Sequence, residues 1–237
     1  METEANRILV IPDVHGRSFW KKAVEETPCE KIVFLGDYMD PYAREGIRDE
    51  DALGVFFDVL NVKKMQEKKV VLLLGNHDLH YLSKHFRDLA RGTRYNDDLS
   101  DIISGEFRKH QDWFCLAHEE KMGEMRYLFT HAGVNSSWYE RHHSLIQELN
   151  AKNLNRLLAI WNGVTALADV GRERGGRSTT GSMVWADSDE MKTSEPFPGV
   201  YQIFGHSQHA SPIITNHYAC LDCKKAFLLN AQGLTMV

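Results

Sequence analysis

The sequence lacks the features that mark several protein classes. None of its uninterrupted apolar runs, such as residues 70–74, exceeds five residues, whereas a membrane-spanning helix needs roughly 18 apolar residues, so we expect no contact with a membrane. Four cysteines in 237 residues are too few for a disulfide framework. Lysine and arginine number 28 against 33 acidic residues, and the resulting net charge of −5 argues against stable binding to nucleic acid.

Internal repeats, low-complexity tracts and linkers rich in Pro, Gly or Ser are also absent. The first residues, 1–5, are polar and acidic, which is wrong for a signal peptide. A content of 43% hydrophobic and 26% charged residues is close to the globular average and excludes disordered and fibrous classes. We therefore expect an intracellular, cytoplasmic protein with a single domain over residues 1–237.

The first third of the chain contains a regular alternation of predicted strands and helices. Short apolar runs that are rich in β-branched residues predict buried strands over 7–12, 31–35 and 69–74. Helical stretches over 18–26 and 49–66 separate them. Such an alternation implies right-handed crossovers and a largely parallel sheet, whose loops meet at the carboxyl edge of the strands.

The rest of the chain adds helices and a second sheet. Helical patterns cover residues 79–91, 100–110 and 138–167, and the apolar stripe of the last one, which includes Trp161, is expected in the core. Further strands, partly antiparallel, are predicted over 126–130, 182–186, 200–204, 212–215, 219–221 and 226–229. The predicted fold class is therefore α/β, with two mixed β-sheets flanked by helices.

Metal-ligating residue types follow five of these strands. A single Asp or His at such a place is usually a helix cap or a solvated turn residue, but five strand ends in series are hard to obtain by chance. The residues are Asp13, His15, Asp37, Asp40, Asn76, His77, His131 and His206. Carboxylate, amide and imidazole donors suit Mn²⁺, Fe, Zn²⁺ or Mg²⁺. The donors exceed what one ion needs, so two ions that share a carboxylate are expected.

These motifs, in their order and spacing, resemble the calcineurin-like metallophosphoesterase superfamily across residues 8–209. They are Asp13-x-His15-Gly16, Gly36-Asp37-x-x-Asp40, Gly75-Asn76-His77-Asp78, Thr130-His131-Ala-Gly133 and Gly205-His206. Within that superfamily they look most like the serine/threonine protein phosphatase branch, which includes small bacterial and phage enzymes.

The resemblance implies a role for each of these residues. The first ion would be held by Asp13, His15 and Asp37. The second would be held by Asp37, Asn76, His131 and His206. A hydroxide between the two ions would be the nucleophile, and His77, oriented by Asp40, would donate a proton to the leaving oxygen. Mn²⁺ is the first candidate for both ions.

The chain departs from the protein phosphatase pattern where that pattern binds phosphate. Pro41 stands where the family has an arginine after the second aspartate, Asp78 replaces a glutamate, and no arginine lies between residues 187 and 205. Four arginines in nearby loops are the candidate replacements: Arg17, Arg44, Arg48 and Arg177.

The expected reaction is hydrolysis of a phosphomonoester, on a phosphoprotein or a small phosphoester. The alternative is a hydrolase of dinucleoside polyphosphates or other nucleotides, because related hydrolases share the motifs. A metal-binding scaffold without activity is a further alternative, against which the intact ligands and the Asp40–His77 pair argue. The sequence leaves open the oligomeric state, and the roles of His209, Cys220 and Cys223.

Overall fold

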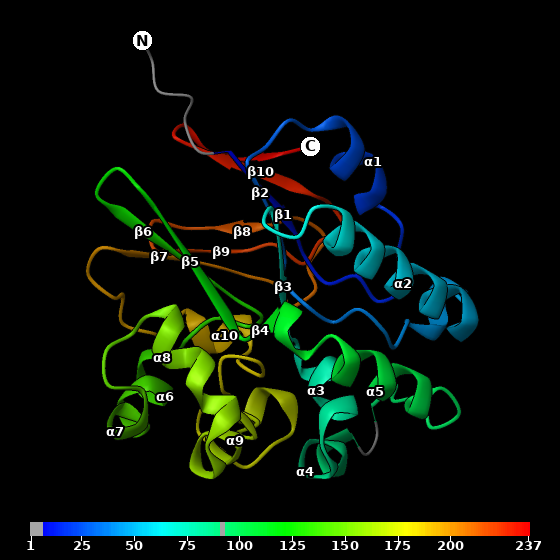
Figure 1. Ribbon diagram of the computed structural model, residues 1–237. Helices are drawn as coiled ribbons and strands as arrows, with labels where there is room; N and C mark the ends of the chain where they lie inside the picture. The colour runs from blue at the N-terminus through cyan, green and yellow to red at the C-terminus, as the bar shows by residue number, and fades with distance from the viewer. Residues whose placement is uncertain (1–6, 91–92) are drawn as a thin grey trace. The chain divides into compact units, whose positions relative to one another are not determined.

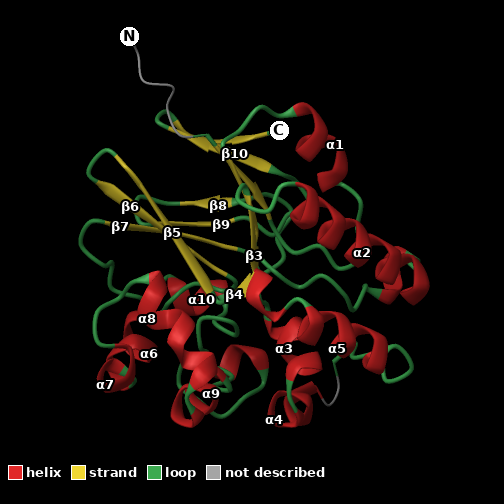
Figure 2. Cartoon of the chain, in the orientation of Figure 1, coloured by secondary structure: helices red, strands yellow, loops and turns green. Residues whose placement is uncertain are grey.

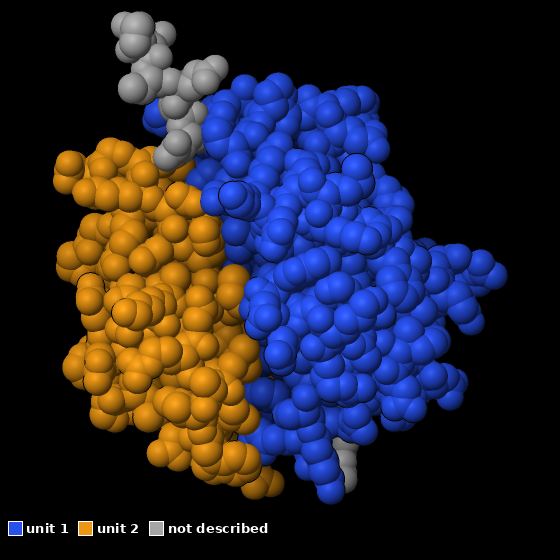
Figure 3. Space-filling view, viewed as in Figure 1, with its two compact units in different colours: residues 1–114, 224–237 blue, residues 115–223 orange. Residues whose placement is uncertain are grey.

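The computed structural model describes residues 7–90 and 93–237, which form two compact units (Figure 3). The first unit comprises the chain up to Phe114 together with Lys224–Val237, and the second comprises Cys115–Cys223. Each unit is built on its own sheet, six-stranded in the first and five-stranded in the second within the described residues. The expectation of one domain over 1–237 stays a prediction.

The first sheet has the order β11-β10-β1-β2-β3-β4. Its strands are β1 (Ile8–Ile11), β2 (Lys31–Phe34), β3 (Val70–Leu73), β4 (Phe114–Cys115), β10 (Phe227–Asn230) and β11 (Gly233–Met236). As expected, β1, β2 and β3 run parallel. Strand β10 pairs antiparallel with β1, so the assignment of residues 226–229 to the second sheet was wrong. That long-range pairing has no signature in the local sequence.

Helices α1 and α2 lie along one side of this sheet (Figure 1). The helical segments of the unit are α1 (Trp20–Glu26), η1 (Ala43–Glu45), α2 (Asp49–Met65), α3 (Asn76–Leu82), α4 (Lys84–Arg87), η2 (Asp88–Ala90), α5 (Ser100–Lys109) and η3 (Gln111–Trp113). The single helix expected over 79–91 is divided at Ser83, whose backbone is extended and whose hydroxyl accepts a hydrogen bond from the backbone N–H of Phe86. A serine in this conformation begins a new helix by capping its N-terminus.

The second sheet has the order β5-β6-β7-β9-β8 (Figure 2). Its strands are β5 (Ala117–Met122), β6 (Met125–Thr130), β7 (Val200–Phe204), β8 (Ile213–Ile214) and β9 (Tyr218–Cys220). Strands β6, β7 and β9 are parallel, and β5 joins β6 through a hairpin turn at Gly123, where φ is +61°. The polar composition of β5 concealed it from the sequence analysis.

The helices of the second unit are short, and the continuous helix expected over 138–167 was wrong. They are α6 (Ser136–Arg141), α7 (His143–Ile146), α8 (Ala151–Asn155), η4 (Arg156–Ala159), α9 (Trp161–Leu167), η5 (Arg172–Arg174) and α10 (Ser188–Met191). The chain leaves the helical region at Gln147, where φ is +61°, and Asn150 caps α8 through its side chain. Trp161 is 71% exposed and does not belong to the core.

Residues 182–186 were expected as a strand and instead form a buried turn. The backbone N–H groups of Trp185 and Ala186 both donate to the carbonyl of Ser182. The apolar content of this segment reflects its burial, which a turn can share with a strand. The fold class itself, α/β with two mixed sheets and helices, is confirmed. Across residues 7–90 and 93–237, no helix combines the length and the apolar character needed to cross a membrane.

Candidate metal centre

Three predicted site residues follow the three parallel strands of the first unit. Asp13 comes after β1, Asp37 after β2 and Asn76 after β3, and each side chain is at most 2% exposed. Because neighbouring parallel strands end at the same edge, the three loops lie together. A carboxylate buried to this degree needs hydrogen-bond donors or a cation beside it.

Backbone hydrogen bonds connect these loops. The N–H of His15 donates to the carbonyl of Asp37 at 2.7 Å, and the N–H of Gly16 donates to that of Tyr38 at 3.0 Å. At Gly36, where φ is +104°, an added Cβ would lie 2.5 Å from the backbone nitrogen of Gly75, so only glycine permits this approach of the second and third loops. The loops are therefore held as one structure.

Asp78 completes this connection. Its carboxylate accepts hydrogen bonds from the backbone N–H groups of Asp37, Tyr38 and Gly75 at 2.7, 3.0 and 2.8 Å. Burial, together with the charge of Asp37, raises the pKa of Asp78, and the three N–H donors act in the opposite direction. Asp78, which in the sequence is a departure from the family pattern, thus anchors two loops through its side chain.

Several site residues have strained backbones. Six non-glycine residues of the described chain have positive φ, and four of them are predicted site residues: His15, Asp37, Asp40 and His206. This conformation costs an L-residue about 1–2 kcal/mol. Such strain gathers at functional sites, where the position of a side chain matters more than local stability.

Asp13, His15 and Asp37 form a potential ligand group, since their ligand atoms lie within 4.8 Å of one another. Nε2 of His15 is 3.5 Å from Oδ2 of Asp37. Nδ1 of His15 lies 2.8 Å from the carbonyl oxygen of Met39, and because a carbonyl can only accept, Nδ1 is the protonated nitrogen. Burial holds the pKa of His15 well below its usual range, so the ring is neutral and presents Nε2 as a donor to a metal.

His77 and Asp40 form a buried pair beside this group. Nδ1 of His77 lies 2.6 Å from Oδ2 of Asp40, and the hydroxyl of Tyr81 donates to Oδ1 of the same carboxylate. Burial lowers the pKa of His77, but the charge of Asp37 and the hydrogen bond to Asp40 outweigh it, so the net shift is upward. The charged form of His77, which can donate a proton, is thereby favoured.

Arg94 is a site residue that the sequence analysis missed. Its Nη2 lies 3.4 Å from Nε2 of His15 and 3.4 Å from Nε2 of His77, while its Nε donates to the carbonyl of Asp40 at 2.8 Å. The guanidinium carbon is 3.6 Å from the centre of the Tyr42 ring. No motif surrounds Arg94 in the sequence, so only the path of the folded chain reveals it.

The four arginines named from the sequence have other surroundings. Arg17 is buried and donates to both carboxylate oxygens of Glu45 at 2.7 and 3.1 Å. Arg48 is exposed and makes two hydrogen bonds of 2.8 Å to Asp51. The guanidinium of Arg44 lies 4.9 Å from the centre of the Tyr42 ring. Arg177 is an exposed residue of the second unit.

In the second unit, two predicted ligands follow adjacent parallel strands. His131 comes after β6 and His206 after β7, and Nε2 of His131 lies 3.1 Å from Nδ1 of His206. Both rings are buried. His209, whose role was left open, has its Nε2 3.0 Å from the hydroxyl of Ser188.

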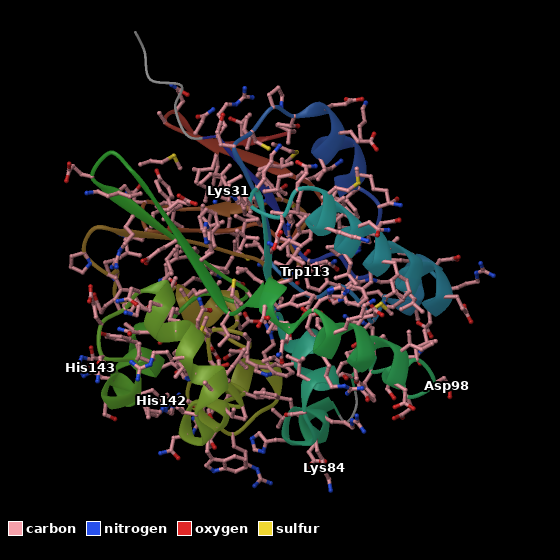
Figure 4. The ribbon with its side chains drawn as sticks, in the orientation of Figure 1. Lys31, Lys84, Asp98, Trp113, His142 and His143 are labelled. Carbon is pink, nitrogen blue, oxygen red and sulfur yellow. The ribbon has the colours of Figure 1, made fainter. Side chains whose placement is uncertain are left out.

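Other residues that drew attention in the sequence lie outside these groups. The thiol of Cys220 contacts the carbonyls of Gly205 and Ser207 at 3.3 and 3.5 Å, as a buried structural cysteine does. His142 and His143, labelled in Figure 4, lie where α6 ends and α7 begins. The donors that remain are buried carboxylates, an imidazole and one amide in the first unit, and two buried imidazoles in the second. This donor set fits divalent ions of the Mn²⁺, Fe, Zn²⁺ and Mg²⁺ type.

Comparison with known proteins agrees with this geometry. Residues 6–210 match the family model described as calcineurin-like phosphoesterase. No curated protein sequence matches the chain. Among solved structures, a protein serine/threonine phosphatase from Saccharomyces cerevisiae, described as similar to human phosphatase PP5, superposes with a TM-score of 0.56. The two share 13% identity over 98% of this chain and 79% of that one, so the likeness concerns the fold. The chain belongs to the calcineurin-like phosphoesterase family and is a metal-dependent phosphoesterase.

Proposed function

We propose that this protein hydrolyses phosphomonoesters with two divalent metal ions, Mn²⁺ being the first candidate. The observation that carries the proposal is the buried His77–Asp40 pair, with 2.6 Å between Nδ1 and Oδ2, beside the Asp13–His15–Asp37 group. A proton donor next to a cluster of metal ligands suits the cleavage of a phosphoester whose leaving oxygen must be protonated. A location in the cytoplasm stays an expectation from the sequence.

The ligands divide between two ions according to the family pattern. Asp13, His15 and Asp37 would hold one ion, and the pattern assigns Asp37, Asn76, His131 and His206 to the other. When bound, two such ions lower the pKa of a water molecule and neutralise charge on the phosphate oxygens. Asn76 adds no charge to the ligand set, which keeps the centre favourable for a dianionic phosphate.

The protein's own contribution to bond cleavage is the proton at Nε2 of His77. Asp40 occupies Nδ1, which fixes the ring orientation and stabilises the imidazolium. Asp40 is in turn held by the Tyr81 hydroxyl. The backbone N–H of His77 donates to Oδ1 of Asp37 at 3.0 Å, which ties the acid to the ligand group. The leaving oxygen would receive this proton as its bond to phosphorus breaks.

A panel of substrates tests the proposal. The Mn²⁺-loaded protein is assayed with a phosphopeptide, a dinucleoside polyphosphate, an aryl phosphate monoester and the matching diester. We expect the monoesters to be hydrolysed with the highest kcat/KM, and chelation of the metal to abolish turnover. Preferential cleavage of the dinucleoside polyphosphate would instead favour a nucleotide hydrolase. The absence of metal-dependent turnover on every substrate would refute the proposal.

A further inference from the structure

The geometry points to Arg94 as the residue that binds the substrate phosphate, in place of the arginine that the family pattern has at position 41. This inference rests on the proposed function and specifies how its site recognises the phosphoryl group. Arg94 comes from the loop before α5, far in sequence from Pro41. The residues that carry the inference all belong to the first unit.

The guanidinium of Arg94 lies beside two imidazole rings of the site. Nη2 of Arg94 lies at the same distance, 3.4 Å, from Nε2 of His15 and from Nε2 of His77. One of these nitrogens is a potential metal donor and the other is the proposed proton donor. A phosphate whose leaving oxygen is within reach of Nε2 of His77 must therefore lie beside Nη2 of Arg94. An imidazole nitrogen that coordinates a metal ion has no lone pair left for Nη2, which would then donate to an anion.

The guanidinium is held in place without a carboxylate partner among the described residues. Its Nε donates to the Asp40 carbonyl and its face lies 3.6 Å from the centre of the Tyr42 ring, both of which restrict its orientation. Among the described residues, no carboxylate pairs with Arg94, whereas Arg17 and Arg48 are each bound by one. A cation that is oriented but not neutralised is suited to bind an anionic ligand.

The backbone contact of Arg94 lies next to Pro41. The Asp40 carbonyl that receives Nε of Arg94 belongs to the peptide bond directly before Pro41. The guanidinium of Arg94 thus contacts the backbone directly before the position at which the family pattern has an arginine. The side chain of proline has no hydrogen-bond donor for phosphate, so in this protein another segment of the chain supplies the donor.

The segment that carries Arg94 is tied to the acid pair. The ring of Tyr95 stacks on that of Tyr81 at 4.6 Å, and the N–H of Asn96 donates to the Tyr81 hydroxyl at 3.0 Å. The same hydroxyl donates to Asp40. Tyr81 therefore positions the proton donor and the phosphate-binding arginine relative to each other. A planar guanidinium so held matches two non-bridging oxygens of a phosphate monoester dianion.

Inorganic phosphate binding tests the inference directly. Its affinity for the Mn²⁺-loaded protein is measured by titration calorimetry for the wild type, Arg94→Met, Arg94→Lys and the control Arg108→Met, an exposed arginine of α5. We expect Arg94→Met to weaken phosphate binding by roughly 10- to 100-fold, the usual effect of removing a hydrogen-bond donor to a charged group. Arg94→Lys should recover part of that loss, and Arg108→Met should match the wild type. Metal content should be the same in all four proteins.

Two outcomes separate this inference from the proposed function. Equal phosphate affinity in Arg94→Met and wild type, with active wild-type enzyme, would overturn the role of Arg94 and leave phosphoester hydrolysis intact. Phosphate binding that depends on Arg94 in a protein without turnover would support the role of Arg94 and refute the proposed function. A wild type that binds no phosphate would overturn the role of Arg94 as well.

Discussion

Nδ1 of His77 lies 2.6 Å from Oδ2 of Asp40, and both side chains are buried. This contact leaves Nε2 of His77 as the ring nitrogen that can act on a substrate. His77 lies at the start of α3, directly after the proposed ligand Asn76, whereas Asp40 comes from the loop after β2.

Replacing His77 by alanine should reduce kcat on an alkyl phosphate by roughly 10²- to 10⁴-fold, the usual contribution of a general acid. The loss should be much smaller on a nitrophenyl ester, because that leaving group departs without a proton. Asp40→Asn should give the same pattern more weakly. The measurement is kcat on both esters, with metal content as the control. Equal losses on both esters with the metals retained would remove His77 from the role of acid.

Asp37→Asn should lose most of the bound metal and nearly all turnover. The proposal makes Asp37 a ligand of both ions, and an amide binds a hard cation less strongly than a carboxylate does. Metal per chain is determined by elemental analysis after gel filtration, with Asp101→Asn, an exposed position of α5, as the matched control. A variant that retains two ions per chain and normal activity would contradict a shared carboxylate.

Tyr81→Phe should lower both stability and turnover. The hydroxyl that it removes donates to Asp40 and accepts from the N–H of Asn96. A buried group left without its partner costs about 1–3 kcal/mol, which urea unfolding can measure. If Tyr81 positions Asp40 and the Arg94 segment, kcat on the alkyl phosphate should fall more than kcat on the nitrophenyl ester, and KM should rise on both. A loss of stability with unchanged kinetics would reduce Tyr81 to a structural residue.

Glu45 should make the stability of the first unit sensitive to acid. Burial raises the pKa of its carboxyl, but hydrogen bonds from Arg17 and Lys224 outweigh this and lower the pKa from 4.5 to about 2. Because the folded pKa lies below the unfolded one, the stabilisation is complete above pH 4.5 and is lost as the pH falls toward 2. Removing one partner of a largely buried ion pair costs on the order of 1–3 kcal/mol.

The comparison is the free energy of unfolding in urea of wild type and Glu45→Gln, at pH 7 and again near pH 3. We expect the free energy of unfolding to be clearly higher for the wild type than for Glu45→Gln at pH 7, and this difference to be smaller near pH 3. Asp51→Asn serves as the control, since Asp51 pairs with Arg48 on the exposed surface and should change little at either pH. A Glu45→Gln effect that is the same at both pH values would show that the charge of Glu45 is not the source of the stabilisation.

The sequence by itself was sufficient for the parts of the protein that depend on local pattern. Apolar runs followed by polar, glycine-containing loops identify β1, β2 and β3, and parallel strands deliver the residues after them to one edge. The α/β class followed from the alternation of predicted strands and helices, and family membership followed from the motifs in the loops after the strands. The ligand assignments made from them stay predictions, with Asp13, His15 and Asp37 grouped as expected.

Only the tertiary structure decided the contacts between segments that are distant in sequence. The pairing of β10 with β1 depends on hydrogen bonds between the two ends of the first unit, for which no local pattern exists. The single helices expected over 79–91 and 138–167 are interrupted at Ser83 and Gln147, because backbone conformation at one residue can override helical periodicity. The sequence did not indicate Arg94, because it lies outside any motif. Its position beside His15 and His77 depends on the folded chain, in which the Arg94 segment contacts Tyr42 and Tyr81.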